Sequence, residues 1–244
     1  MALDESLAES HSILGHVYWN YDFDWRGTEK EFRRALELNP NEATTYIRQA
    51  FYFISVGRSE EAFRAIERYK TLDPASFPGA LLPVGVIAYF GHDYEMAREQ
   101  LEKVTEMAPL FPSPYYWLGA VYLEQGEKTM SIRAFKKSVD LSRRAPVALA
   151  GLGFGLARVG RTAEAETILT ELLAVQSRRY LPEFYTACLF AALGRRDEAF
   201  EWLDRSYREH ANGLNLLRVS PLVDDLRADP RFEELLRRLD LAPS

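Results

Sequence analysis

Two histidines near the start of the chain have side chains that could bind a metal. His11 and His16 lie five residues apart, whereas two zinc ligands on one helix need a spacing that places them on the same face. His92 and His210 lie near expected helix turns, where a solvated side chain is the simpler interpretation. We therefore expect no metal site and no cofactor.

Nucleophilic or acid–base chemistry would need Cys188 or a pair of carboxylates. Cys188 falls in an apolar helical pattern with no evident base nearby, and a buried cysteine usually packs as a small apolar residue. Adjacent acidic residues point to different faces of a helix, and those near helix starts stabilise backbone donors there. Such pairs are Asp22 with Asp24, Glu60 with Glu61, and Asp224 with Asp225. We expect no catalytic residues and no enzyme.

The glycine-rich stretch GLGFG at 151–155 suggests a phosphate-binding loop only superficially. It lacks the preceding strand and the third glycine that such a loop requires. We expect these glycines to serve helix packing.

Composition and charge limit the possible partners. The chain of 244 residues has a formal net charge of -6, with 36 acidic and 30 basic residues and no long block of like charge. Binding along nucleic acid needs clustered Lys and Arg, so we expect no nucleic-acid partner. No apolar run is long enough to cross a membrane, and one cysteine cannot form an internal disulfide. We expect a cytoplasmic protein with no membrane partner.

A period of about 34 residues runs through most of the chain, and it determines which elements could position a site. The segments RALELNP, RYKTLDP and KVTEMAP end at Pro40, Pro74 and Pro109, which are 34 and 35 residues apart. A small residue that opens a second helix recurs at spacings of 34, 35, 34, 34 and 34, at Thr28, Ala62, Ala97, Ser131, Ala165 and Ala199. One structural unit is therefore expected in six copies.

Each copy contains two helical apolar patterns separated by a break, which predicts a helix hairpin. Glycines that could end the first helix in a left-handed conformation stand at Gly57, Gly91, Gly126, Gly160 and Gly194. Helix starts are indicated at Asn41 and Ser59, and at Thr28 with Glu31 as a capping box.

The fourth copy resembles the tetratricopeptide repeat through Tyr115, Leu118, Gly119, Tyr122, Ser131 and Phe135. The resemblance implies an all-α fold, a right-handed α-solenoid of about six hairpins in residues 1–211. The expected repeats are 5–40, 41–74, 75–109, 110–143, 144–177 and 178–211. Residues 212–244 form a C-terminal capping segment, in which Asp229 and Pro230 should start a capping helix with an apolar face.

Two features depart from the repeat pattern. Pro83 lies inside an expected helix, which should start near Leu82 or be kinked. The first hairpin contains YDFDWRG at 21–27, and we expect Tyr21, Phe23 and Trp25 to plug the open end of the stack.

YDFDW and the C-terminal SPLVDDLRADPRFEELLRRL together resemble the repeat regions of larger bacterial proteins. In those proteins, similar arrays follow a winged-helix, adenylate-cyclase or serine/threonine-kinase domain. The resemblance implies a scaffold or regulatory arm of a signalling protein, and it suggests that the chain is a fragment or a stand-alone relative of such a protein.

The repeat resemblance also implies where a partner would bind. The first helices of successive hairpins line a concave groove, on the side away from their packing seam. The expected groove residues are Ile47, Phe51, Ile54, Leu82, Val86, Tyr89, Tyr116, Ala120, Leu123, Phe154, Phe184 and Cys188, and the same stripe includes Ala150, Ala157, Leu181 and Ala191. These residues make the groove apolar.

Relatives that grip the carboxylates of heat-shock chaperones use Lys, Asn and Arg at such positions, and here only Arg48 and Arg158 lie beside the stripe. We expect the groove to bind a protein or peptide, such as an amphipathic helix of a partner. Two alternatives are that the chain's own residues 214–240 cover the groove, or that a second copy does so in a homo-oligomer.

Overall fold

The computed structural model describes residues 7–75, 77–174 and 182–241, and these residues form helices and turns without a strand. None of the helices in these ranges has the length and apolar character needed to cross a bilayer. Consecutive helices pack as six antiparallel hairpins. The hairpins are α1 (Ala8–Val17) with α2 (Trp25–Leu38), α3 (Ala43–Ser55) with α4 (Ser59–Leu72), α5 (Phe77–Phe90) with α6 (Tyr94–Met107), α7 (Pro112–Glu124) with α8 (Lys128–Leu141), α9 (Pro146–Arg158) with α10 (Thr162–Ala174), and α11 (Glu183–Ala192) with α12 (Arg196–Arg208). The all-α solenoid expected from the sequence is confirmed.

Small residues form the seam inside each hairpin. The six residues that define the period are all 0% exposed: Thr28, Ala62, Ala97, Ser131, Ala165 and Ala199. In the fourth hairpin, a Cβ at Gly119 would lie 2.7 Å from the ring of Phe135, and the Ser131 hydroxyl donates to the carbonyl oxygen of Gly119 at 2.7 Å. The period therefore reflects positions where only a small side chain lets two helices pack closely.

Two helix starts differ from the expected ones. α2 begins at Trp25, three residues before Thr28, because the carboxylate of Asp24 accepts the backbone N–H of Gly27 at 2.8 Å and caps the helix. α3 begins at Ala43 with Glu42 as the N-cap, so the expected start at Asn41 is also wrong. α4 begins at Ser59, as expected.

The turns within the hairpins follow the glycines with one exception. Gly57, Gly126, Gly160 and Gly194 have positive φ angles, as expected, but Gly91 does not. In that turn His92 adopts the left-handed conformation, with φ at 61°. The backbone N–H of His92 bonds to the carbonyl oxygen of Tyr89, so the turn closes one residue later than the sequence suggests.

Pro83 does not mark the start of its helix. α5 runs from Phe77 to Phe90 with Pro83 inside it, so the expected start near Leu82 is wrong. The proline lacks the N–H that would bond back along the helix, and the burial of Val84, Ile87 and Tyr89 stabilises the helix in spite of that loss.

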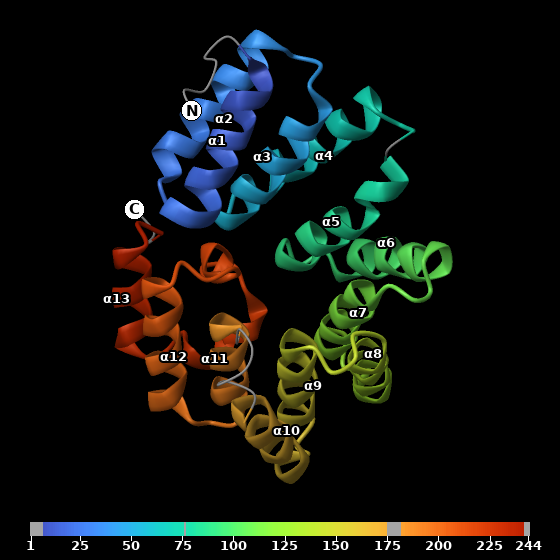
Figure 1. Ribbon diagram of the computed structural model, residues 1–244, viewed down its shortest axis with the longest axis vertical. Coiled ribbons are helices and arrows are strands. Elements are labelled where there is room, and N and C mark those ends of the chain that lie inside the picture. The colour runs from blue at the N-terminus through green and yellow to red at the C-terminus, as the bar shows by residue number, and fades with distance from the viewer. Residues whose placement is uncertain (1–6, 76, 175–181, 242–244) are drawn as a thin grey trace.

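Glycines of α9 allow the array to curve tightly. A Cβ at Gly151 would overlap the ring of Tyr116 in α7, and one at Gly155 would lie 2.7 Å from Phe135 in α8. The rings of Tyr116 and Tyr185 have centroids 5.8 Å apart, so α7 and α11 meet across α9. The hairpins therefore curl into a ring rather than an extended superhelix, as Figure 1 shows.

The ring closes where the first hairpin meets the last one. We call this contact the ring joint. The indole N–H of Trp25 donates to the carbonyl oxygen of Leu239 at 2.5 Å, and the ring of Phe23 stacks on Tyr207 with centroids 6.3 Å apart. The joint consists of Tyr21, Phe23 and Trp25 on one side and Tyr207, His210 and Leu239 on the other. The aromatic residues expected to plug an open end thus join that end to the opposite one.

The helix α13 (Pro230–Arg238) begins after Asp229 with Pro230 as its first residue, as expected. The carboxylate of Asp229 accepts the backbone N–H of Arg231 at 3.0 Å and caps it. Two ion pairs join α13 to α12: Arg231 with Asp197 at 2.9 Å, and Arg238 with Asp204 at 2.6 Å. The buried apolar face consists of Phe232, Leu235, Leu236 and Leu239.

Candidate protein-interaction surface

The expected groove residues lie on α3, α5, α7, α9 and α11, and most of these helices face the inside of the ring (Figure 1). Eight of the twelve are buried: Ile54, Val86, Tyr89, Tyr116, Ala120, Phe154, Phe184 and Cys188. The other four are partly buried: Ile47, Phe51, Leu82 and Leu123. Leu181 lies outside the described residues.

The centre of the ring is packed with side chains from helices far apart in the sequence. Tyr116 of α7 lies near Tyr89 of α5 and near Tyr185 and Cys188 of α11. Burial raises the pKa of both Tyr89 and Tyr116 well above its ordinary value. These side chains are part of the buried apolar core.

The chain's own C-terminal region covers part of the concave face, at α3 and α11. We call residues 211–226 the inner segment; it contains two 3₁₀ turns, η2 (Leu214–Leu216) and η3 (Pro221–Leu226). η2 contacts α3 and η3 contacts α11. A Cβ at Gly213 would lie 2.6 Å from the ring of Phe184, which shows how closely the backbone approaches that groove residue. The fully buried apolar side chains of the segment are Leu214, Leu217, Val223 and Leu226.

The accessible apolar groove expected from the sequence is therefore filled in this structure. The twelve positions carry apolar or aromatic residue types, which favour burial. The chain itself contributes covering surface, which corresponds to the alternative that its own residues 214–240 cover the groove. Whether the twelve residues also contact a partner stays a prediction.

Comparison with known proteins agrees with this architecture. The sequence pattern of the tetratricopeptide repeat family matches residues 87–219, which is more than half of the 244 residues. The chain belongs to the tetratricopeptide repeat family. Among curated proteins, none matches this sequence.

Solved structures share the fold of this tetratricopeptide repeat protein at low sequence identity. PilF from Pseudomonas aeruginosa has a TM-score of 0.57 and 21% identity, over 87% of this chain and 96% of PilF. PilW, a type IV pilus biogenesis factor, has a TM-score of 0.61 and 17% identity, over 72% and 81% of the two chains. MamA from Desulfovibrio magneticus has a TM-score of 0.55 and 22% identity, over 73% and 100%.

An ion pair ties the inner segment of the repeat protein to the array. Arg158, at the end of α9, pairs with Asp225 of η3 at 2.9 Å. The neighbouring Asp224 pairs with Arg227 at 2.6 Å. Burial raises the pKa of Glu124, which lies close to these groups. Asp224 and Asp225 thus each form an ion pair with an arginine.

The side chains of His11, His16 and Cys188 in the repeat protein are paired or buried. His11 pairs with Glu31 at 2.5 Å. Burial and the charge of Arg48 lower the pKa of His16, whose Nδ1 has no hydrogen-bond partner. Burial raises the pKa of the Cys188 thiol, which keeps it protonated and unreactive. No group of three His, Cys, Asp or Glu residues in the described ranges could hold a metal ion.

The contact of the inner segment with α3 and α11 corresponds to the alternative that residues 214–240 cover the groove, but the sequence did not show which helices the segment contacts. Its signal was the apolar content of NLLRVSPLV at 215–223, which has no helical period because the segment consists of short 3₁₀ turns. A stretch that is apolar without a helical or strand pattern has to cover something, and the partner surface is far away in the sequence.

Proposed function

We propose that this tetratricopeptide repeat protein is a protein-interaction module that binds an apolar segment of a partner on its concave face. The observation that supports the proposal is the inner segment itself, because it is an irregular apolar polypeptide accommodated against α3 and α11. A partner segment of similar chemistry would bind by replacing the inner segment or by extending its surface.

Four groove residues remain partly exposed and would be contacted first: Ile47, Phe51, Leu82 and Leu123. Replacing the inner segment would additionally break the Arg158–Asp225 pair, which is largely solvated and therefore costs little. The apolar contacts of the segment would be exchanged for those of the partner.

The test compares capture of partner proteins by wild type and by a Phe51→Gln, Leu123→Gln variant. We expect a protein captured by wild type to be lost with the variant, since both changes remove apolar contact area from the concave face. The measurement is a pull-down with quantitative mass spectrometry, and circular dichroism confirms that the variant folds.

A matched control changes two exposed apolar residues of α1 that belong to neither proposed binding surface. Ile13 and Val17 are 43% and 42% exposed, so Ile13→Gln with Val17→Gln should leave capture unchanged. Equal capture by the concave variant and by wild type would contradict the proposal.

We extend this proposal to a scaffold or regulatory arm of a bacterial signalling protein in the cytoplasm, without catalysis of its own. The support is the resemblance of residues 21–25 and 220–239 to the arrays of such proteins. Sequencing the coding region next to this one tests it, and the absence of any adjoining kinase, cyclase or winged-helix domain would count against it. Self-association through the concave face is the alternative function, and light scattering on the purified chain would detect it.

A further inference from the structure

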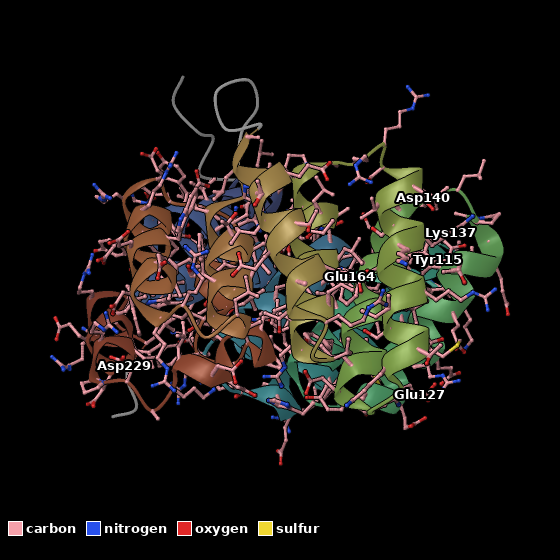
Figure 2. All side chains as sticks on the ribbon, turned by 90° about the horizontal axis from the view of Figure 1, so that it is seen from below. Tyr115, Glu127, Lys137, Asp140, Glu164 and Asp229 are labelled. Carbon is pink, nitrogen blue, oxygen red and sulfur yellow. The ribbon has the colours of Figure 1, made fainter. Side chains whose placement is uncertain are left out.

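A cavity of about 1030 Å³ lies on the outer face of the ring, away from the concave face. It is lined by α6, α7 and α8 and by the turn between α9 and α10. Tyr115, Lys137 and Asp140 line it, and Figure 2 labels Lys137 and Asp140 on α8 and Glu164 on the neighbouring α10. We call this cavity the outer cleft.

Four cations on α8 line the outer cleft, and all four are exposed: Lys128, Arg133, Lys136 and Lys137. None of them forms an ion pair with another residue of the described ranges, although Lys136 lies within electrostatic range of Glu164. By contrast, Glu102 and Arg161, which also line the cleft, are paired with Arg98 and Glu164 at 2.9 and 2.5 Å. The free positive charge of this region is therefore concentrated on one helix.

The neighbouring outer helices have the opposite charge. α8 contains four basic residues and one acidic residue, for a net charge of +3. α6 contains four acidic and two basic residues, for -2, and α10 contains three acidic residues, for -3. On a chain with a net charge of -6, the cleft is a local positive surface bordered by negative ones.

The cleft also offers apolar contacts. Leu118, Tyr122 and Ile132 are buried in its wall, and Tyr115 lines it from α7. The hydroxyl of Tyr115 donates to the carbonyl oxygen of Pro109 at 3.1 Å, which places the α6–α7 turn next to the cleft. That turn carries three exposed apolar side chains: Met107, Leu110 and Phe111.

We propose that the outer cleft binds an acidic peptide segment of a partner protein that also carries an apolar or aromatic side chain. Unpaired cations attract carboxylates, and the adjoining apolar wall and turn accommodate the second kind of side chain. The volume fits several residues rather than one small anion. A long nucleic acid would have to pass the acidic α6 and α10, which repel its phosphates. This site is separate from the concave face and goes beyond the function proposed above.

The test measures fluorescence anisotropy of a labelled peptide added to the full chain. The probe is a peptide of twelve residues with eight glutamates around a central Phe-Leu pair, and the reference probe has glutamine in place of glutamate. The cleft variant is Lys128→Glu, Arg133→Glu, Lys136→Glu, Lys137→Glu. The control reverses four exposed cations on α2 and α4: Lys30→Glu, Arg34→Glu, Arg64→Glu, Lys70→Glu.

We expect the glutamate peptide to bind wild type and the control variant within about twofold of each other, and the cleft variant at least about tenfold more weakly. Binding should weaken as salt rises. Equal binding to the cleft variant, equal binding of the glutamine peptide, or no binding to wild type would each overturn the proposal.

Two further readouts test other occupants. Tighter binding of a twelve-residue oligothymidylate, lost in the cleft variant, would reassign the cleft to nucleic acid. Light scattering that shows a dimer dissociated by the cleft variant would reassign it to a second copy of the chain. The Phe51→Gln, Leu123→Gln variant should bind the glutamate peptide like wild type, which separates failure of this proposal from failure of the concave-face proposal.

Discussion

His92 carries a side chain at a left-handed backbone position that favours glycine. It is exposed and adopts a φ of 61° in the turn between α5 and α6. The equivalent turn after α7 uses Gly126, with φ at 76° and open space where a Cβ would lie. Left-handed backbone is unfavourable for residues with a Cβ, so the two turns form a natural pair for comparison.

We predict that His92→Gly stabilises the protein by roughly 0.5–1 kcal/mol, and that Gly126→His destabilises it by a similar amount. The reason is the steric conflict of a Cβ in left-handed backbone. The free energy of unfolding from urea titration checks both variants. The two variants must change the free energy of unfolding in opposite directions. A loss of stability in His92→Gly would show that the contact of His92 with the Tyr94 hydroxyl contributes more to stability than relief of the left-handed backbone.

His16 makes the stability of the protein depend on pH. Burial and Arg48 lower the pKa of His16 below 6.5 in the folded chain, so in that range the unfolded chain binds more protons than the folded one. The contribution of neutral His16 to the free energy of unfolding is complete above about pH 6.5, the pKa in the unfolded chain. It is lost as the pH falls towards the pKa of His16 in the folded chain. We predict that His16→Gln reduces the loss of stability between pH 7.5 and 5.5.

Urea unfolding at the two pH values measures this effect, with His92→Gln as a control at an exposed histidine. The control should lose stability with falling pH as wild type does. A wild-type slope in His16→Gln would assign the loss of stability at low pH to groups other than His16. Glu124 would not be among them, because its raised pKa acts in the opposite direction.

At the scale of the element, the inner segment is held by apolar contacts rather than by regular hydrogen bonding. Leu217 is 0% exposed between η2 and η3. We predict that Leu217→Ala destabilises the chain by about 2–5 kcal/mol through the cavity it leaves. Hydrogen exchange should quicken mainly in residues 211–226, and less in α6 to α8.

Leu110→Ala, at a side chain that is 77% exposed, is the matched control and should change neither stability nor exchange. If Leu217→Ala raised exchange evenly along the chain, the inner segment would be part of one cooperative core. It could not then be exchanged for a partner segment as proposed above.

The period of the sequence predicted the elements well but not their ends. Ala62 and Ala97 mark the seams because a small residue is required at each packing position, and this requirement is local in sequence. The start of α2 at Trp25 depends on Asp24, which competes with Thr28 as a cap, and local pattern does not decide between two caps. Whether the apolar stripe binds a partner stays a prediction. The sequence showed an apolar inner segment but not that it contacts α3, about 170 positions away.

At the scale of the whole molecule, the ring depends on the close packing of α9 and on the ring joint. The curvature accumulates from small residues such as Gly151, and no single repeat contains enough information to fix it. The cleft on α8 likewise requires knowing which outer helices are neighbours. Sequence alone shows the charges of α8, but not that they line one cavity.

We predict that Phe23→Ala with Trp25→Ala opens the ring joint. The change removes two aromatic contacts and the bond to Leu239, and truncation of a buried Trp alone costs about 3–5 kcal/mol. Small-angle X-ray scattering should show a larger radius of gyration, while far-UV circular dichroism stays close to wild type because the hairpins are stabilised locally.

Met107→Ala with Leu110→Ala is the control for this measurement, since both side chains lie outside the joint. An unchanged radius of gyration in the joint variant, with helicity preserved, would mean that the inner segment alone keeps the ends together. Trp25→Phe serves as a milder variant that retains the aromatic ring and removes only the bond to Leu239.

The bond between Trp25 and Leu239 links positions 214 residues apart. In a linear stack, each unit has two neighbours at most, and loss of one interface frees everything beyond it. In a ring, the two units on either side of a broken interface are still connected through all the other units. The entropy of closing so long a loop grows only with the logarithm of its length. The smallest part of this chain that can unfold independently is therefore expected to be larger than one repeat.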